Sequence, residues 1–134
     1  MKKLIATALA ASAMAVVPAA SAQDAPSKGE QKLAKMLEGR VAGEAEDCIF
    51  VSGTSPQMTI IDKTAIVYRQ GSTIWVNRPE HPENLDDSDI LVTERFGGNF
   101  CRLDHTYMID RTGGFYSGPV FLGQFVPYRL PDKG

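Results

Sequence analysis

The sequence TIIDKTAIVYRQGSTIWVNR, residues 59–78, is richer in β-branched and aromatic residues than any other stretch of the chain. Gly71-Ser72 interrupts it, and a two-residue loop with glycine first is typical of a type II′ hairpin turn. This turn sets the following residues opposite each other: Tyr68 and Trp75 on one face, and Val67 and Val76 on the other. Both faces are apolar, so we expect each to be covered by another part of the chain.

The N-terminus has the three parts of a secretory signal peptide. Met1-Lys2-Lys3 is basic, LIATALAASAMAVVPAA is apolar, and Ala20-Ser21-Ala22 places small residues where a signal peptidase cleaves. A membrane anchor is the alternative, because about 17 apolar residues nearly span a bilayer. Pro18 and the small-residue site favour cleavage after Ala22. We therefore expect residues 1–22 to be a signal peptide and the mature protein to lie in the periplasm or outside the cell.

Length and charge limit the function of the mature chain. Removal of residues 1–22 leaves 112 residues (134 − 22), with 12 basic and 16 acidic side chains and a net charge of −4. The absence of a basic cluster argues against nucleic acid as a partner, because phosphate binding requires clustered lysine and arginine. No second apolar run is long enough to cross a membrane, so we expect no stable membrane anchor after signal cleavage.

The mature part contains two cysteines, Cys48 and Cys101, in a compartment that permits oxidation. A disulfide between them closes a loop of 54 residues (48–101) and restricts the unfolded chain by about 4 kcal/mol in the chain-entropy model. A pair of reactive or metal-binding thiols is the alternative, but the sequence has no C-x-x-C motif. We predict a structural disulfide.

Residues 23–44 contain a lead-in and one amphipathic helix. Ser27-Lys28-Gly29-Glu30 matches the S-x-x-E capping box, in which each side chain satisfies a free backbone amide of the other residue. Apolar residues follow at helical spacing: Leu33, Met36 and Leu37. We expect this helix to lie on the sheet.

From Cys48 onward the period of the sequence changes from helical to strand-like. Short apolar runs separated by turn residues predict about six or seven strands. The strands are expected at 48–51, 58–61, the two arms of the hairpin, 90–96, 100–110 and 120–129. The predicted fold is therefore mainly β: a compact antiparallel sheet or small barrel over residues 45–130, with one N-terminal amphipathic helix besides the signal-peptide helix.

Residues 100–110 alternate more regularly than any other segment. One face would carry Cys101, Leu103, His105, Tyr107 and Ile109, and the other Arg102, Asp104, Thr106, Met108 and Asp110. We expect the first face to point inward, with His105 at the edge of the core, and this strand to extend the sheet beside the hairpin. Gly123, between Phe121 and Phe125, predicts curvature of the final strand or an aromatic ring that covers the glycine.

Five segments occur in an order that resembles a known protein family. They are Cys48-Ile49, 64–68 (TAIVY), 75–78 (WVNR), 100–104 (FCRLD) and 122–125 (LGQF). Over residues 45–128 the chain resembles a family of small exported proteobacterial proteins classed as a domain of unknown function. Some members of that family carry a second cysteine pair, which this chain lacks in 80–89 and 119–121. The resemblance implies a location in the cell envelope and supplies no activity.

Several patterns bear on metal binding and catalysis. Asp86, Asp87 and Asp89 are weak calcium candidates, because hard cations bind clustered carboxylates. The loop lacks the spacing of an EF-hand, and the alternative is a solvated loop that binds no metal. His81 and His105 are the only histidines and are too few for a zinc site by themselves. No nucleotide-binding, haem-attachment or G-x-S-x-G motif is present, so we expect no cofactor and assign no catalytic residue.

A binding surface is the remaining candidate. Tyr68, Trp75, Arg78 and Arg102 would form an aromatic and basic ligand platform if their face of the sheet were open; the alternative, which we favour, is that the two rings pack under the helix. We predict a non-catalytic envelope protein that binds another protein or a small envelope ligand. The alternatives are a small periplasmic hydrolase whose acids come together only in the fold, and a loop-bound calcium module.

Overall fold

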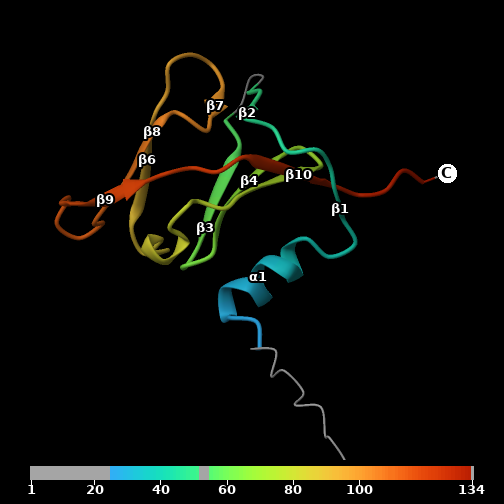
Figure 1. Cartoon of the computed structure of the whole chain (residues 1–134), viewed down its shortest axis with the longest axis horizontal. Coiled ribbons are helices and arrows are strands. Elements are labelled where there is room, and N and C mark those ends of the chain that lie inside the picture. Colours follow the sequence, from blue (N-terminus) through green and yellow to red (C-terminus); the bar gives the residue numbers. More distant parts are fainter. Residues whose placement is uncertain (1–24, 52–54, 134) are drawn as a thin grey trace, which may run out of the picture.

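The computed structural model describes residues 25–51 and 55–133, so the predicted signal peptide lies outside the described residues. This part of the chain is mainly β, with one α-helix at its start (Figure 1). No helix in it is long and apolar enough to cross a membrane. In chain order the elements are α1 (Lys28–Met36), β1 (Val41–Ala42), β2 (Cys48–Ile49), β3 (Gln57–Ile61), β4 (Ala65–Gln70), β5 (Thr73–Asn77), the 3₁₀ helix η1 (Pro82–Asn84), β6 (Ile90–Glu94), β7 (Phe100–Cys101), β8 (His105–Ile109), β9 (Tyr116–Val120) and β10 (Phe125–Arg129).

The central hairpin has the predicted register. β4 and β5 pair antiparallel, with Tyr68 opposite Trp75. Gly71 has a φ of +57°, as the first loop position of a type II′ turn requires. The hairpin lies in the middle of a five-stranded sheet of order β1-β10-β5-β4-β3. The prediction that the strand of Cys101 extends this sheet is wrong: β3 and β10 occupy both sides of the hairpin, and β7 pairs with β2.

A second layer faces the five-stranded sheet. It consists of the three-stranded antiparallel sheet of order β6-β8-β9 and the β2–β7 pair. The larger hydrophobic core draws its members from both layers. Its buried residues are Ile49, Ile66, Tyr68, Trp75, Leu85, Leu91, Met108, Val120, Leu122 and Phe125.

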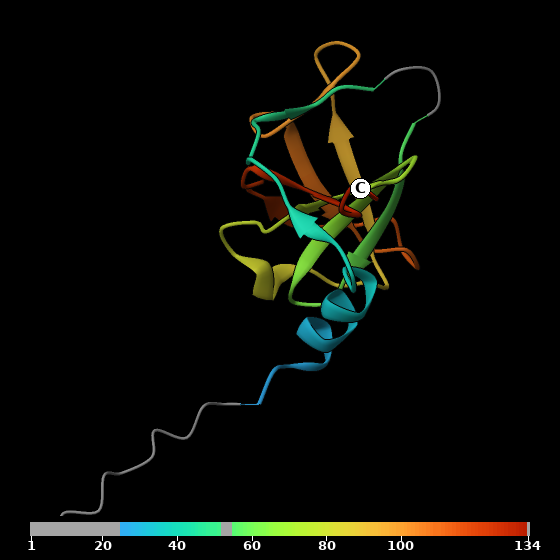
Figure 2. The same ribbon diagram turned by 90° about the vertical axis from the view of Figure 1, so that its right-hand side faces the viewer.

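Helix α1 covers the outer face of the hairpin, at one end of the strands (Figures 1 and 2). Leu33 packs there in a smaller core with Ile61, Ala65, Val67, Ile74 and Val76. The interpretation that Tyr68 and Trp75 pack under the helix is therefore wrong, because both rings face the second layer. A helix with one buried leucine supplies too little apolar surface to cover two large rings, whereas the second layer supplies enough.

The capping box is half formed. The Ser27 hydroxyl accepts a hydrogen bond from the Glu30 N–H at 3.2 Å, as predicted. The Glu30 carboxylate, however, accepts two hydrogen bonds from the Arg78 guanidinium, at 2.6 and 3.1 Å, instead of capping Ser27. This bidentate pair joins α1 to the residue that follows β5.

The predicted strand over 100–110 is wrong in extent and in facing. β7 ends at Cys101, and a turn over 102–104 separates it from β8. Asp104 closes this turn: its carboxylate accepts from the Cys101 N–H at 2.8 Å, and its own N–H donates to the Cys101 carbonyl at 3.0 Å. After the turn Thr106 and Met108 are buried, and His105 faces solvent. The inward face is the one that was predicted to point outward: Phe100 packs against the main core before the turn, and Thr106 and Met108 are buried after it. Alternation defines two faces of a strand but does not say which of them meets the core.

The predicted final strand over 120–129 is confirmed only for β10; its first residue, Val120, is the last residue of β9, which lies in the other layer. β9 belongs to the three-stranded sheet and β10 to the five-stranded sheet, and the red ribbon of Figure 1 runs from one to the other. At the crossing, the Asn77 side chain donates to the Gly123 carbonyl at 2.8 Å and accepts from the Gly123 N–H at 2.9 Å. A Cβ at Gly123 would lie 2.5 Å from the Arg78 carbonyl oxygen. Gly123 thus allows a close crossing between sheets, rather than the curvature within one strand that its position suggests.

Candidate functional site

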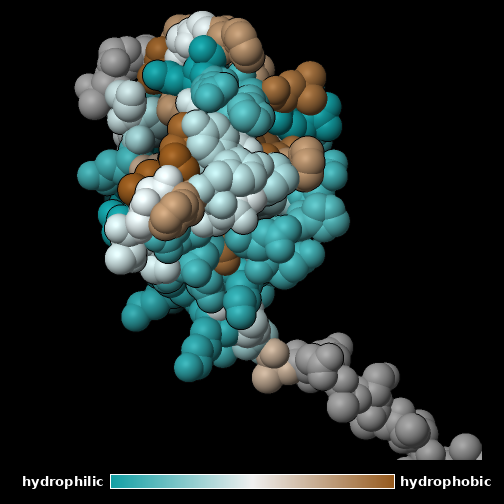
Figure 3. Space-filling view, turned by 90° about the vertical axis from the view of Figure 1, so that its left-hand side faces the viewer, coloured by the Kyte–Doolittle hydropathy of each residue, from teal (hydrophilic) through white to brown (hydrophobic). Residues whose placement is uncertain are grey.

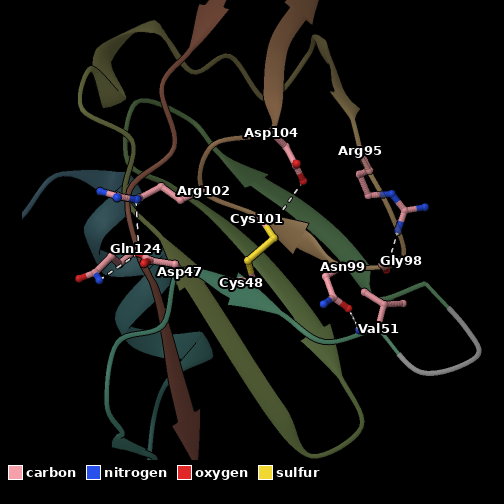
Figure 4. The surroundings of a disulfide bond; sticks show 10 residues. All are labelled: Asp47, Cys48, Val51, Arg95, Gly98, Asn99, Cys101, Arg102, Asp104 and Gln124. Carbon is pink, nitrogen blue, oxygen red and sulfur yellow. Dashed lines mark hydrogen bonds and ion pairs between the residues drawn. A yellow bond between two sulfur atoms is a disulfide. The ribbon is translucent and has the colours of Figure 1, made fainter.

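The predicted disulfide is present and anchors one end of the second layer (Figure 4). Cys48 and Cys101 lie directly opposite each other in the β2–β7 pair, with their Cα atoms 4.0 Å apart. The Asn99 side chain also accepts a hydrogen bond from the Val51 N–H at 3.4 Å. These links hold β7, which the turn over 102–104 follows, against β2.

The turn over 102–104 carries an exposed charged residue and an exposed apolar residue. Arg102 contacts the Asp47 carboxylate at 3.3 Å, and the same oxygen accepts a hydrogen bond from the Gln124 side chain at 3.2 Å (Figure 4). Leu103 is 87% exposed. Sequence alternation placed Leu103 in the core, whereas the turn directs it into solvent.

A cleft of about 300 Å³ lies next to this turn. Its buried part comprises Thr106, Val120 and Leu122, and the exposed Leu103 and Phe121 stand on its rim. Its remaining lining residues are Glu80, Arg102, Asp104, His105 and Pro119. The cleft therefore has an apolar base that is continuous with the core and a rim that combines apolar and charged side chains.

A row of rings leads away from the cleft along the outer face of β8 and β9. The His105 and Tyr107 rings have centroids 5.2 Å apart, and those of Tyr107 and Tyr116 are 5.7 Å apart. The Glu94 carboxylate lies 3.2 Å from His105 Nδ1 and accepts a hydrogen bond from the Tyr107 hydroxyl at 3.4 Å. Partial desolvation and the Glu94 charge raise the pKa of Tyr107.

Because His105 lines the cleft and begins the row, the two features form one surface, which we call the aromatic face: Leu103, His105, Tyr107, Tyr116 and Phe121. Figure 3 views the molecule from the side on which β8 and β9 lie in Figure 1, and shows hydrophobic residues in separate patches among hydrophilic ones. The prediction that His105 lies on the inward face is wrong, because the core contacts the opposite face of β8, which carries Thr106 and Met108. The tight Cys-Arg-Leu-Asp turn is the sequence signal that could have located Leu103.

The four predicted ligand-binding residues do not form one open platform. Tyr68 is 1% exposed and Trp75 is also buried, with the Tyr68 hydroxyl and the Trp75 indole nitrogen lacking partners among the described residues. Burial and the nearby Asp104 carboxylate raise the pKa of Tyr68 above its ordinary value. Arg78 is paired with Glu30, and Arg102 is the member of the set that lines the cleft. The prediction of an open aromatic and basic platform is therefore wrong, because its two rings are core residues.

The acidic loop brings carboxylates together, but in a different set from the predicted one. Oxygens of Asp62, Asp86 and Asp87 lie within 4.8 Å of one another, whereas Asp89 is not part of this group. Asp86 accepts hydrogen bonds from the N–H and hydroxyl of Ser88, at 2.8 and 2.6 Å, and these bonds lower its pKa. Calcium takes about six to eight oxygens, so three exposed carboxylates do not by themselves form a site.

Asp104 and His105, which as neighbours in the sequence could suggest a hydrolase, make separate structural contacts. The Asp104 carboxylate binds the backbone of Cys101, and the His105 ring binds Glu94. His81, the other histidine, lies 3.3 Å from Glu83 in the exposed loop. Among these described residues, the arrangement does not place a base next to a nucleophile.

Comparison with known proteins gives no relative from which to carry over a function. No family model matches the chain, and no curated protein or solved structure is similar enough to match it.

Proposed function

We propose that the protein is a non-catalytic binding protein of the cell envelope, and that its aromatic face recognises another protein. The observation that carries this proposal is the exposed Leu103 on a turn anchored by a disulfide. A large apolar side chain fixed in solvent does not stabilise the fold, and such side chains mark interaction sites where they cluster. Leu103 clusters with Phe121 at the rim of the cleft.

The composition of the aromatic face favours a protein over a small ligand. Tyrosine, phenylalanine and arginine are enriched at the centres of protein interfaces. Tyr107 and Phe121 belong to the aromatic face, and Arg102 lines the cleft beside them. Ligand pockets occupy about 300–1,000 Å³, so this cleft of about 300 Å³ lies at the lower limit. It fits one or two apolar side chains of a partner better than a whole metabolite.

Export is part of the proposal. A disulfide is typical of an oxidising compartment and supports a periplasmic or extracellular location. Fractionation of the source bacterium and N-terminal sequencing test this point. We expect the protein in the envelope fraction with Gln23 at its N-terminus; an intact Met1 in the cytoplasmic fraction would contradict export.

Site-specific photocrosslinking tests the aromatic face. A photoreactive amino acid replaces Leu103 in one sample and Leu130, which is also exposed but lies outside the aromatic face, in a control sample. In envelope extract we expect one discrete protein adduct from position 103 and none from position 130. Phe121→Ala combined with the probe at position 103 should lower the adduct yield about tenfold, as expected for the loss of an interface anchor.

Two outcomes would count against protein recognition. Equal adducts from positions 103 and 130 would mean that the crosslinks reflect exposure alone. A co-purified small molecule, detected by native mass spectrometry and lost in Phe121→Ala, would assign the cleft to a small envelope ligand instead.

A further inference from the structure

A second concave feature lies between the two sheets, apart from the aromatic face. This groove of about 370 Å³ is bordered by residues 58–60 of β3 and by Ile90 and Leu91 of β6. β3 is an edge strand of the five-stranded sheet and β6 an edge strand of the three-stranded sheet. The chain closes one side of the sandwich where β9 leads into β10, and the side between β3 and β6 is open.

The two strands that border the groove are regular edge strands of the described sheets, and α1 packs near the Ile61 end of β3. Proteins normally shorten edge strands or interrupt them with proline or bulges, because their free N–H and C=O groups bind other strands. β1 has two residues, as do β2 and β7, and β9 contains Pro119 and pairs irregularly with β8. β3 and β6 have five residues each, regular pairing and no proline.

The chemistry of the groove suits an extended peptide. Leu91 belongs to the main core, and Ile60 packs against it. Met58 lies on the same side of β3 as Ile60 and is 41% exposed. The apolar part of the groove therefore consists of the exposed Met58 and the half-buried Ile60 above the buried Leu91. Charged side chains of both signs border it: Lys32, Asp87, Asp89 and Arg111. Within the described residues none of these four forms an ion pair.

We infer that this groove binds an extended peptide segment of a partner protein, which adds as a strand to the edges of β3 and β6. Main-chain hydrogen bonds would supply affinity, and alternate side chains on the apolar part of the groove would supply specificity. The segment that fits has apolar residues at alternate positions and charged residues of both signs at its ends. The groove shares no lining residue with the aromatic face, so the inference stands independently of the proposed function.

Charge argues against a second copy of this chain as the occupant. β6 ends in Glu94 and is preceded by Asp87 and Asp89, so acids flank both of its ends. Antiparallel pairing of two β6 strands about a twofold axis would bring Asp89 of each copy near Glu94 of the other. Like charges in such positions oppose association.

The test uses the isotope-labelled protein and a panel of synthetic heptapeptides. The peptides have the forms K-x-T-x-T-x-E and E-x-T-x-T-x-K, where x is Val, Ile, Leu or Phe. NMR detects millimolar binding, and we expect the amide signals of β3 and β6 to shift and to exchange more slowly with solvent. Two analogues of the best peptide, N-methylated at alternate residues, keep the side chains but lose backbone donors. We expect at least one to bind about tenfold more weakly.

A pair of variants on one strand locates the site. Met58→Lys places a charge in the apolar part of the groove, whereas Gln57→Lys adds the same charge to the neighbouring residue, which does not line the groove. We expect about tenfold weaker binding for the first variant and less than about a twofold change for the second. The amide spectra of both variants report whether the fold is retained.

Three results would overturn the inference. The first is no shift of the β3 and β6 amides with any peptide at millimolar concentration. The second is equal binding of the parent and both N-methylated peptides, which would exclude strand addition. The third is slow exchange of these amides with solvent in the absence of peptide, if the protection increases with protein concentration. A second copy of the chain would then occupy the groove.

Discussion

The crossing between the two sheets depends on Asn77, and its removal provides the most direct test of the fold. Asn77 is completely buried, and its side chain satisfies both the N–H and the C=O of Gly123, at 2.9 and 2.8 Å. Asn77→Ala leaves both backbone groups without these partners. A buried polar group that loses its hydrogen bond costs about 1–3 kcal/mol. Gly123 itself is only half-buried, so water partly compensates, and we expect a loss of about 2–4 kcal/mol in the free energy of unfolding.

Denaturant unfolding followed by tryptophan fluorescence measures this loss, because Trp75 is the only tryptophan and lies in the main core. Asn84→Ala is the matched control: Asn84 is exposed, and its side chain makes no hydrogen bond with a described residue. We expect a change below about 0.5 kcal/mol for the control. A loss below that value for Asn77→Ala as well would refute the assignment of the crossing to this side chain.

Asn77→Asp separates the donor from the acceptor. The aspartate keeps an acceptor for the Gly123 N–H, but when ionised it has no donor for the Gly123 carbonyl. Burial raises the folded-state pKa of such a carboxyl above its unfolded value. The stability of this variant is therefore greatest below the unfolded pKa and falls as pH rises through the folded pKa. Unfolding measured at about pH 4 and pH 7 should show a smaller deficit relative to wild type at the lower pH.

Two further predictions concern links between distant parts of the chain. Replacement of Cys48 and Cys101 by serine should lower the free energy of unfolding by about 4 kcal/mol, because the disulfide joins residues that are 53 positions apart. Two free thiols in the native protein would contradict the disulfide. The Glu30–Arg78 pair lowers the pKa of Glu30, through hydrogen bonds from Arg78 above all, so its contribution is present above the unfolded pKa and is lost as pH falls through the folded pKa. Both side chains are about half exposed, so Glu30→Gln should lower the free energy of unfolding by less than about 1 kcal/mol near neutral pH and by almost nothing in acid. Denaturant unfolding at the two pH values measures this difference. An equal loss at both pH values would contradict a contribution from the ion pair.

The parts of the fold that were predictable from sequence are those with local causes. Gly71-Ser72 fixes the register of the central hairpin, because a two-residue loop leaves one way to pair Tyr68 with Trp75. Ser27 likewise marks the start of α1 through a hydrogen bond to a residue three positions away. The disulfide was predictable for another reason: two cysteines have one intramolecular pairing, and the signal-peptide pattern predicted a compartment in which it can form.

The parts that were not predictable depend on contacts between distant residues. The face with Phe100 and Met108 points inward because Phe100 packs beside Tyr68, which is far away in the sequence, and the turn closed by Asp104 directs Leu103 into solvent. The layer that covers Tyr68 is set by the route of the chain through Gly123, 55 residues later (123 − 68). The aromatic face combines both effects, so neither Leu103 nor Phe121 stood out before the fold was known.

The disulfide makes the stability of the fold and the proposed recognition of a partner depend on the same bond. It fixes β7 against β2, and the turn that presents Leu103 begins at Cys101. A free turn would have to be ordered at the moment of binding, and that entropy would be subtracted from the affinity. The groove between β3 and β6 contains no residue of β2 or β7 and gains nothing from this anchor. Reduction of the folded protein should therefore weaken recognition by the aromatic face and leave strand addition at the groove unchanged.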